Sequence, residues 1–300
     1  MQLSPDVILG TFSGVLGAAF YAISVAIYRK YADRIEAVAV ASIKMWIALP
    51  FTAVLAFILF YPALPTMSFM TVTLLALSVI FGAVIGDTIY LVSQERIGVS
   101  IAFPISMSYP VLTYALTVLF LGEDLIPVRL VGTVVAVSGV IMVSHEQDIG
   151  GDEEDSKSYD MLGIGLAFLT SVLYAAGAVI LQVGVTDVDP ISGNLVRVFF
   201  GSIAFIPLFA FARRKGMTTP PKRIVKIIAV AALIGMAIGS ILYVNATKLL
   251  GAATTSVIVS SAPLFAVPLS VKYLDERVTP LMAAGVILTV LGIALVVLTS

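Results

Sequence analysis

Three ionisable side chains lie inside long apolar stretches of this sequence: Lys44, Asp87 and Arg197. A charge within a lipid bilayer costs at least about 2–3 kcal/mol, so it normally faces a partner, a wet cavity or a ligand. Lys44 and Asp87 fall at similar depth on consecutive antiparallel helices, which makes an ion pair feasible. Asp87 is also the best candidate for a proton carrier. Arg197 has Ser240 where an acid would correspond, so it needs carbonyls, water, a carboxylate elsewhere or a ligand.

Two acids at helix ends offer a structural alternative. Glu123 lies on the same membrane face as Arg197, and Glu276 lies on the same face as Lys44. The two embedded bases therefore have two interpretations, structural ion pairing or the handling of substrate and protons. For Arg197, the planar guanidinium suits a carboxylate or phosphate better than an ammonium does, so an anionic group of the substrate is the functional hypothesis.

Aromatic residues recur within the apolar segments and not only at their ends. Each tyrosine hydroxyl at such a depth needs a hydrogen-bond partner. These side chains are candidates to line a cavity for amphipathic organic molecules, and hydrogen bonding between helices is the alternative. The residues concerned are Tyr21, Tyr90, Tyr174, Tyr243 and Trp46.

Motifs for catalysis are missing from the sequence. No GxxxxGK[ST] or HExxH pattern occurs, the chain has no cysteine, and its one histidine is His145. An intramembrane enzyme is therefore an alternative without a recognisable catalytic constellation. The acidic run between residues 145 and 160 fits a solvated linker better than a metal site. We expect no enzyme activity, no cofactor and no metal, and the net charge of −1 gives no case for nucleic acid.

The composition indicates that most of the chain is surrounded by lipid. Hydrophobic residues make up 60% of the 300 residues and charged residues 12%. A bilayer core about 30 Å thick requires roughly 20 apolar residues per helix. The expected class is an all-α integral membrane protein with ten transmembrane helices, because continuous apolar runs do not suit a barrel. The predicted spans are 8–28, 37–60, 70–92, 99–121, 128–144, 161–182, 192–212, 224–245, 252–273 and 279–298.

The second half of the sequence repeats the first without a gap, at one fixed offset. We predict a first five-helix repeat over 1–144, an acidic linker over 145–160 and a second repeat over 161–300. Five is odd, so the second repeat enters the membrane from the opposite side. Inverted repeats of this kind are a recurring design of secondary transporters. The matched pairs include Lys44 and Arg197, Tyr21 and Tyr174, Tyr90 and Tyr243, Gly98 and Gly251, Pro110 and Pro263, and Glu123 and Glu276.

These elements resemble the EamA-type transporters of the drug/metabolite transporter superfamily. The resemblance rests on Pro110 within the fourth helix, the turn Leu121–Glu123, Pro127, and the pair Gly132 and Gly139, all with mates in the second half. It covers essentially the whole chain. It implies a ten-helix fold with a central cavity and the import or export of metabolites, amino acids or drugs. The alternative is a channel or scaffold subunit.

Loop charges predict the orientation in the membrane, for which we expect the cell (plasma) membrane. Positively charged loops stay in the cytoplasm. Thirteen Lys and Arg residues flank one set of helix ends and only Arg129 and Lys248 flank the other, which places both termini outside. The resemblance implies cytoplasmic termini instead. The expected partners are the bilayer, a small-molecule substrate and, as coupling ion, protons.

Overall fold

All of the regular structure in the described part of the chain is helical. The computed structural model describes residues 4–31, 34–60, 67–148, 160–218, 220–265 and 279–299. Glu276 and most of the predicted linker lie outside these residues. The first half contains α1 (Pro5–Lys30), α2 (Ala37–Phe60), α3 (Phe69–Val79), η3 (Ile80–Gly86), α4 (Asp87–Ile97), α5 (Val99–Ser106), α6 (Tyr109–Leu116), η4 (Thr117–Leu121) and α7 (Pro127–Asp148). The second half contains α8 (Met161–Val185), α9 (Pro190–Arg214), α10 (Lys222–Ala232), η5 (Leu233–Gly239), α11 (Ser240–Ser260) and α13 (Pro280–Leu298).

Eight helices of the described residues are long and apolar enough to cross a membrane. One of them, Lys222–Phe265, runs for 44 residues, which at roughly 1.5 Å per residue is about twice the thickness of a bilayer core. Gly251 interrupts it with a φ of 79°. A further apolar helix, Pro127–Val143, is shorter than the other spans. The protein is thus a multi-pass membrane protein, and the predicted count of ten is not confirmed.

The sequence repeat reappears in the backbone at the same offset. The π-helical segments η3 and η5 cover Ile80–Gly86 and Leu233–Gly239, which are equivalent positions in the two halves. Gly98 and Gly251 have nearly the same dihedral angles, with φ of 78° and 79° and ψ of 162° and 167°. Only glycine adopts this region readily. The repeat therefore fixes local conformation as well as composition.

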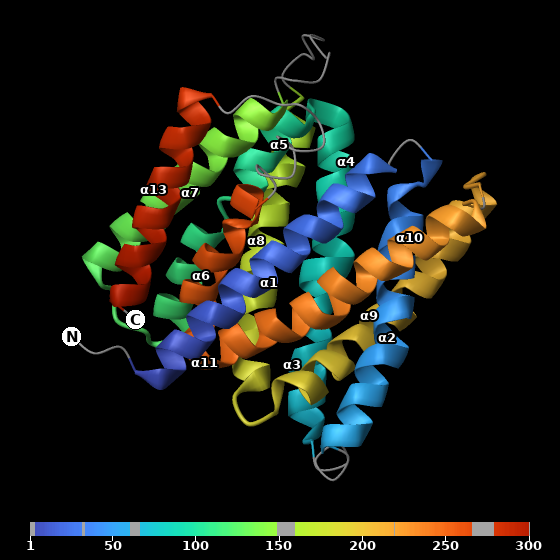
Figure 1. Ribbon diagram of the computed structural model, residues 1–300, viewed down its shortest axis with the longest axis horizontal. Helices are drawn as coiled ribbons and strands as arrows, with labels where there is room; N and C mark the ends of the chain where they lie inside the picture. The colour runs from blue at the N-terminus through green and yellow to red at the C-terminus, as the bar shows by residue number, and fades with distance from the viewer. Residues whose placement is uncertain are drawn as a thin grey trace.

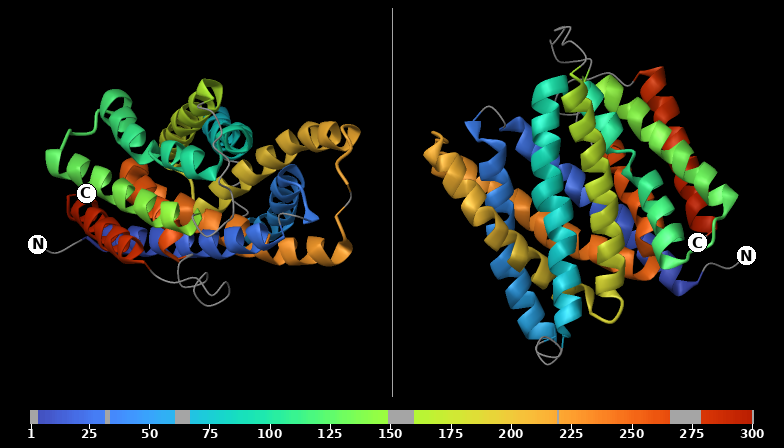
Figure 2. Two further views of the ribbon diagram at one scale, coloured as in Figure 1. Left: turned by 90° about the horizontal axis from the view of Figure 1, so that it is seen from above. Right: turned by 180° about the vertical axis from the view of Figure 1, so that it is seen from behind.

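The two halves pack against each other through equivalent pairs of helices. The first helix of each half lies against the third helix of the other, so α1 packs on α11 and η5 while α8 packs on α3, η3 and α4 (Figure 2). Mate helices also contact each other, α2 with α9 on one flank and α7 with α13 on the other (Figure 1). Equivalent elements of the two halves therefore make equivalent contacts across the boundary between them.

Glycines allow α7 and α13 to cross closely. A Cβ at Gly139 would lie 2.5 Å from the Gly285 carbonyl oxygen, and a Cβ at Gly292 would lie 2.5 Å from the Gly132 carbonyl oxygen. Gly132 thus faces Gly292 and Gly139 faces Gly285, which requires the two helices to be antiparallel. The G-x6-G pattern of the sequence places a small residue at each crossing point.

An ion pair joins the halves at one end of the bundle. Arg96, near the end of α4, donates from Nη1 to Oδ2 of Asp160 at 2.6 Å. Asp160 also caps α8 by accepting a hydrogen bond from the Leu162 amide at 3.0 Å. The hydrogen bond from Arg96 lowers the pKa of this carboxyl. Asp160 therefore stays ionised and holds the start of the second half against the first.

Candidate functional site

Lys44 and Asp87 form an ion pair, which their similar predicted depth in the membrane had made feasible. Nζ of Lys44 on α2 lies 3.0 Å from Oδ2 of Asp87. Asp87 is the first residue of α4, directly after the π-helical segment η3. Such segments occur often at functional sites. The two side chains are 16% and 28% exposed, so the pair is only partly buried.

Tyr174 brings the second half to this pair. Its hydroxyl, on α8, donates to Oδ1 of Asp87 at 2.9 Å. Gly86 makes room for the approach, since a Cβ there would lie 2.8 Å from Cε1 of Tyr174. The Asp87 carboxylate is therefore held by a cation of its own half and a phenol of the other.

Arg197 occupies the equivalent position in the second half but has different surroundings. Its Nε donates to Oγ of Ser78 at 3.1 Å, and its Nη1 donates to Oγ of Ser240 at 3.5 Å. The spacing from Arg197 to Ser240 is 43 residues, the same as from Lys44 to Asp87. Arg197 is only 7% exposed. Among the described residues, no carboxylate forms an ion pair with it.

Tyrosines lie close to both Asp87 and Arg197. The ring of Tyr174 contacts that of Tyr109 edge-on, with centroids 5.7 Å apart. Tyr109, on α6, donates from its hydroxyl to the Ser256 carbonyl at 3.3 Å. The ring of Tyr243 in turn lies 5.5 Å from Cζ of Arg197. Tyrosine rings therefore lie beside both Asp87 and Arg197.

Sequence reasoning missed Tyr109. Its position in the repeat corresponds to Ala262, so a search for matched residues does not select it. The signal that could have found it is its place next to Pro110, where α6 begins. The break between α5 and α6 points this tyrosine toward the other half.

The other predicted aromatic residues have different surroundings. Trp46 donates from Nε1 to the Ser202 carbonyl at 3.1 Å and packs edge-on against Phe209, with ring centroids 5.0 Å apart. It therefore joins α2 to α9. Tyr21 is 51% exposed. Tyr90 packs against the apolar cluster that contains Ile97.

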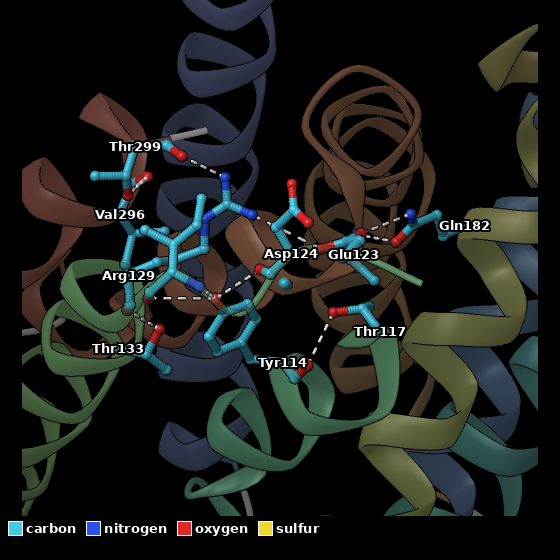
Figure 3. A network of polar contacts seen from close by, with 12 residues as sticks. Tyr114, Thr117, Glu123, Asp124, Arg129, Thr133, Gln182, Val296 and Thr299 are labelled. Atoms are coloured by element: carbon cyan, nitrogen blue, oxygen red, sulfur yellow. Dashed lines mark hydrogen bonds and ion pairs between the residues drawn. The ribbon is translucent and has the colours of Figure 1, made fainter. Parts of the chain in front are cut away.

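Glu123 belongs to a separate polar network near one end of the bundle (Figure 3). It lies 3.7 Å from Nη1 of Arg129 and accepts a hydrogen bond from Nε2 of Gln182 at 3.1 Å. Gln182 accepts the Ala252 amide at 2.6 Å, just after the break at Gly251. The structural alternative that paired Glu123 with Arg197 is therefore wrong in the described conformation. Its proposed counterpart Glu276 lies outside the described residues.

Sequence reasoning also missed Arg129 and Gln182, because their repeat mates are Met282 and Arg29 and the matches are lost. Arg129 links this network to the end of α13 by donating from Nη2 to the Thr299 carbonyl. Tyr114 lies below the guanidinium and accepts the Ile126 amide at 2.7 Å. The network ties α6, α7, α8, α11 and α13 together at this end.

The arrangement contains ion pairs, phenols and an amide. In the described part of the chain, no three His, Cys, Asp or Glu side chains come together in a way that could hold a metal ion. The polar groups can recognise charged and hydrogen-bonding parts of a small molecule, and the tyrosine rings can contact its apolar parts.

Comparisons with known proteins assign both halves of the chain to one family of transporters. The model of the EamA-like transporter family matches twice, over residues 8–145 and 161–298. An uncharacterized transporter of Archaeoglobus fulgidus is 25% identical over 228 residues, which cover 76% of this chain and 77% of that protein.

A second uncharacterized transporter, from Clostridium kluyveri, is 23% identical over 186 residues, which cover 61% of this chain and 58% of that protein. A solved structure, titled only as the crystal structure of a protein, superposes with a TM-score of 0.75 over 99% of this chain and 98% of its own, at 14% identity. That likeness concerns the fold. With both halves matched, the chain belongs to the EamA-like transporter family of the drug/metabolite transporter superfamily, and it is a membrane transporter.

Proposed function

We propose that this protein is a secondary transporter of small organic solutes that works by alternating access. The observation that carries the proposal is the repeated contact of Lys44 with Asp87 and of Arg197 with Ser240, at one spacing in both halves. Two halves with equivalent contacts can exchange conformations, and the exchange would expose a site between them first to one side of the membrane and then to the other.

The proposed architecture has ten spans in two inverted repeats, over 1–144 and 161–300, joined by a linker over 145–160. In this reading the long helix Lys222–Phe265 crosses twice, with Gly251 at its turning point, and Pro127–Val143 crosses once. The network around Glu123 would close one end of the site, because it fixes the helix that starts after Gly251. Breaking that network would open this end.

Asp87 is the proposed coupling residue, with protons as the coupling ion. Its carboxylate accepts from both Lys44 and Tyr174, which belong to different halves. Protonation would weaken both contacts at once. A change in the charge of one carboxyl would then favour separation of α2 and α8 from α4, which is the relation between ion and conformation that a coupled transporter needs.

Counterflow in proteoliposomes tests the proposed function. Vesicles loaded with an unlabelled solute should accumulate the same labelled solute transiently and saturably if the protein is a carrier. The double variant Lys44→Met with Asp87→Asn, which retains a neutral pair, serves as the matched control and should exchange far more slowly. A linear leak that does not saturate would indicate a channel and contradict alternating access.

The orientation in the membrane is a separate prediction, in which both termini face outward. Helix ends that carry Lys30, Arg96 and Arg213 lie together at one end of the bundle, and α1 begins and α13 ends at the other (Figure 1). Because the chain has no cysteine, a cysteine appended at the C-terminus would be the single target of an impermeant thiol reagent. It should react in intact cells, whereas Arg214→Cys should react only after lysis. If the C-terminal cysteine does not react in intact cells, the termini face the cytoplasm and the predicted orientation is wrong.

A further inference from the structure

The embedded charges do not balance in the two halves. Lys44 is neutralised by Asp87 at 3.0 Å, but among the described residues Arg197 contacts neutral groups, the hydroxyls of Ser78 and Ser240 and the ring of Tyr243. Serine dipoles and an aromatic face compensate a cation less well than a full negative charge does. Within the described residues, the second half of the site therefore retains one net positive charge.

Hydrogen-bond donors around Arg197 are also left over. A guanidinium has five N–H donors, and two of them have partners among the described residues. Asn194 lies one turn before Arg197 on α9 and is fully buried. Its Oδ1 accepts from Ser240 at 2.6 Å, whereas its Nδ2 has no partner in the part of the chain that the structure describes. A buried donor left unpaired costs about 1–3 kcal/mol, so an acceptor is expected there.

We propose that Arg197 and Asn194 bind the carboxylate group of the transported solute. The two residues are three positions apart on α9 and so lie on one face of that helix, and a planar guanidinium and an amide are donors that suit a carboxylate. The proposal rests on the proposed transport function and names the class of substrate, a small organic acid or an amphoteric molecule with a carboxylate. The solute's apolar part would lie along Tyr243 and Tyr109.

The first half suggests a matched control, because there the equivalent cation, Lys44, is paired with an acid, Asp87. Replacing Ser240 by aspartate would give Arg197 the acid that Lys44 already has. The internal carboxylate would then occupy the guanidinium and exclude an external one. Arg197→Met removes the charge and keeps most of the side-chain volume. Arg197→Met should not destabilise the protein in the absence of an anion, since it removes an uncompensated buried charge. Ser240→Asp compensates that charge but loses the hydrogen bond that Ser240 donates to Asn194, so its Tm is compared only with its own value in the other salt.

Thermal unfolding of the purified full-length protein tests the site with formate, the smallest carboxylate, in place of the unknown solute. Chloride is replaced by formate at constant sodium, and formamide serves as the uncharged analogue. Tm of the wild type should rise by about 2 °C for each tenfold increase in formate beyond its Kd. Formamide should not raise it. For Ser240→Asp, Tm should be the same in formate as in chloride. The same should hold for Arg197→Met.

Each other outcome is decisive. Equal melting of the wild type in formate and chloride would overturn the carboxylate assignment, and so would variants that respond to formate as the wild type does. A clear loss of stability in Arg197→Met without any anion would make the residue a structural clamp. Arg197→Lys keeps the charge without the planar fork, so its apparent Kd for formate should rise about tenfold while the protein stays folded.

The two proposals can fail separately. If formate stabilises the wild type but no solute shows counterflow, the anion site stands and the transport mechanism falls. If counterflow occurs and carboxylate solutes have no advantage over their amides, the transporter stands and the anion site falls.

Discussion

Replacing Asp87 with asparagine is expected to lower the free energy of unfolding and to stop transport. The change strands the Lys44 ammonium and turns an acceptor of two hydrogen bonds into a neutral amide. Removing one partner of a fully buried ion pair costs about 3–5 kcal/mol. Partial exposure of this pair screens it and reduces the expected loss to about 2–3 kcal/mol.

The double variant provides the control. In Lys44→Met with Asp87→Asn no charge remains unpaired, so stability should recover by at least half of the loss seen in Asp87→Asn. Unfolding in detergent, followed by thermal melting, measures all four proteins of the cycle. If the double variant is as unstable as the sum of the two single variants, the residues do not interact. Transport should stay low in the double variant, because no carboxyl remains to bind a proton.

Gly139→Ala is expected to lower the free energy of unfolding by more than the addition of one methyl group usually does. The new Cβ would lie 2.5 Å from both the Gly285 carbonyl oxygen and Oγ1 of Thr289, and α7 cannot move away without losing its contact with α13. Overpacking usually costs about 1–3 kcal/mol. We expect a loss at the upper end of this range or above, since the clash is with backbone and no rotamer relieves it.

Gly165→Ala on α8 is the matched control for that substitution. A Cβ at this helical glycine would meet nothing within 4 Å. Because alanine has a higher helix propensity than glycine, the substitution should leave the stability unchanged or raise it by up to about 1 kcal/mol. Thermal melting of the two variants side by side gives the comparison. A Gly139→Ala protein as stable as Gly165→Ala would show that α7 and α13 do not cross as closely as described.

Much of the fold can be predicted from the sequence, because membrane insertion depends on local composition. The predicted spans 37–60 and 99–121 agree with α2 and with the helices from Val99 to Leu121 to within a residue. The fixed offset between the halves predicted matched elements, and the π-helical segments and the glycines Gly98 and Gly251 follow it. The depth of Lys44 and Asp87 follows from counting residues along each helix, because the rise per residue is constant, so their proximity could be anticipated as well.

The partners of each side chain were decided by the tertiary structure. Depth along a helix can be counted from the sequence, but rotation about its axis cannot, because a π-helical segment shifts the direction of every residue that follows it. Asp87 and Ser240 both come directly after such segments, so helical periodicity could not show that one faces Tyr174 and the other Asn194. The pairing of Glu123 with Gln182, and not with Arg197, depends on how α8 from the second half inserts against the first. Charge and depth are properties of the chain, whereas neighbours arise only when the two halves pack.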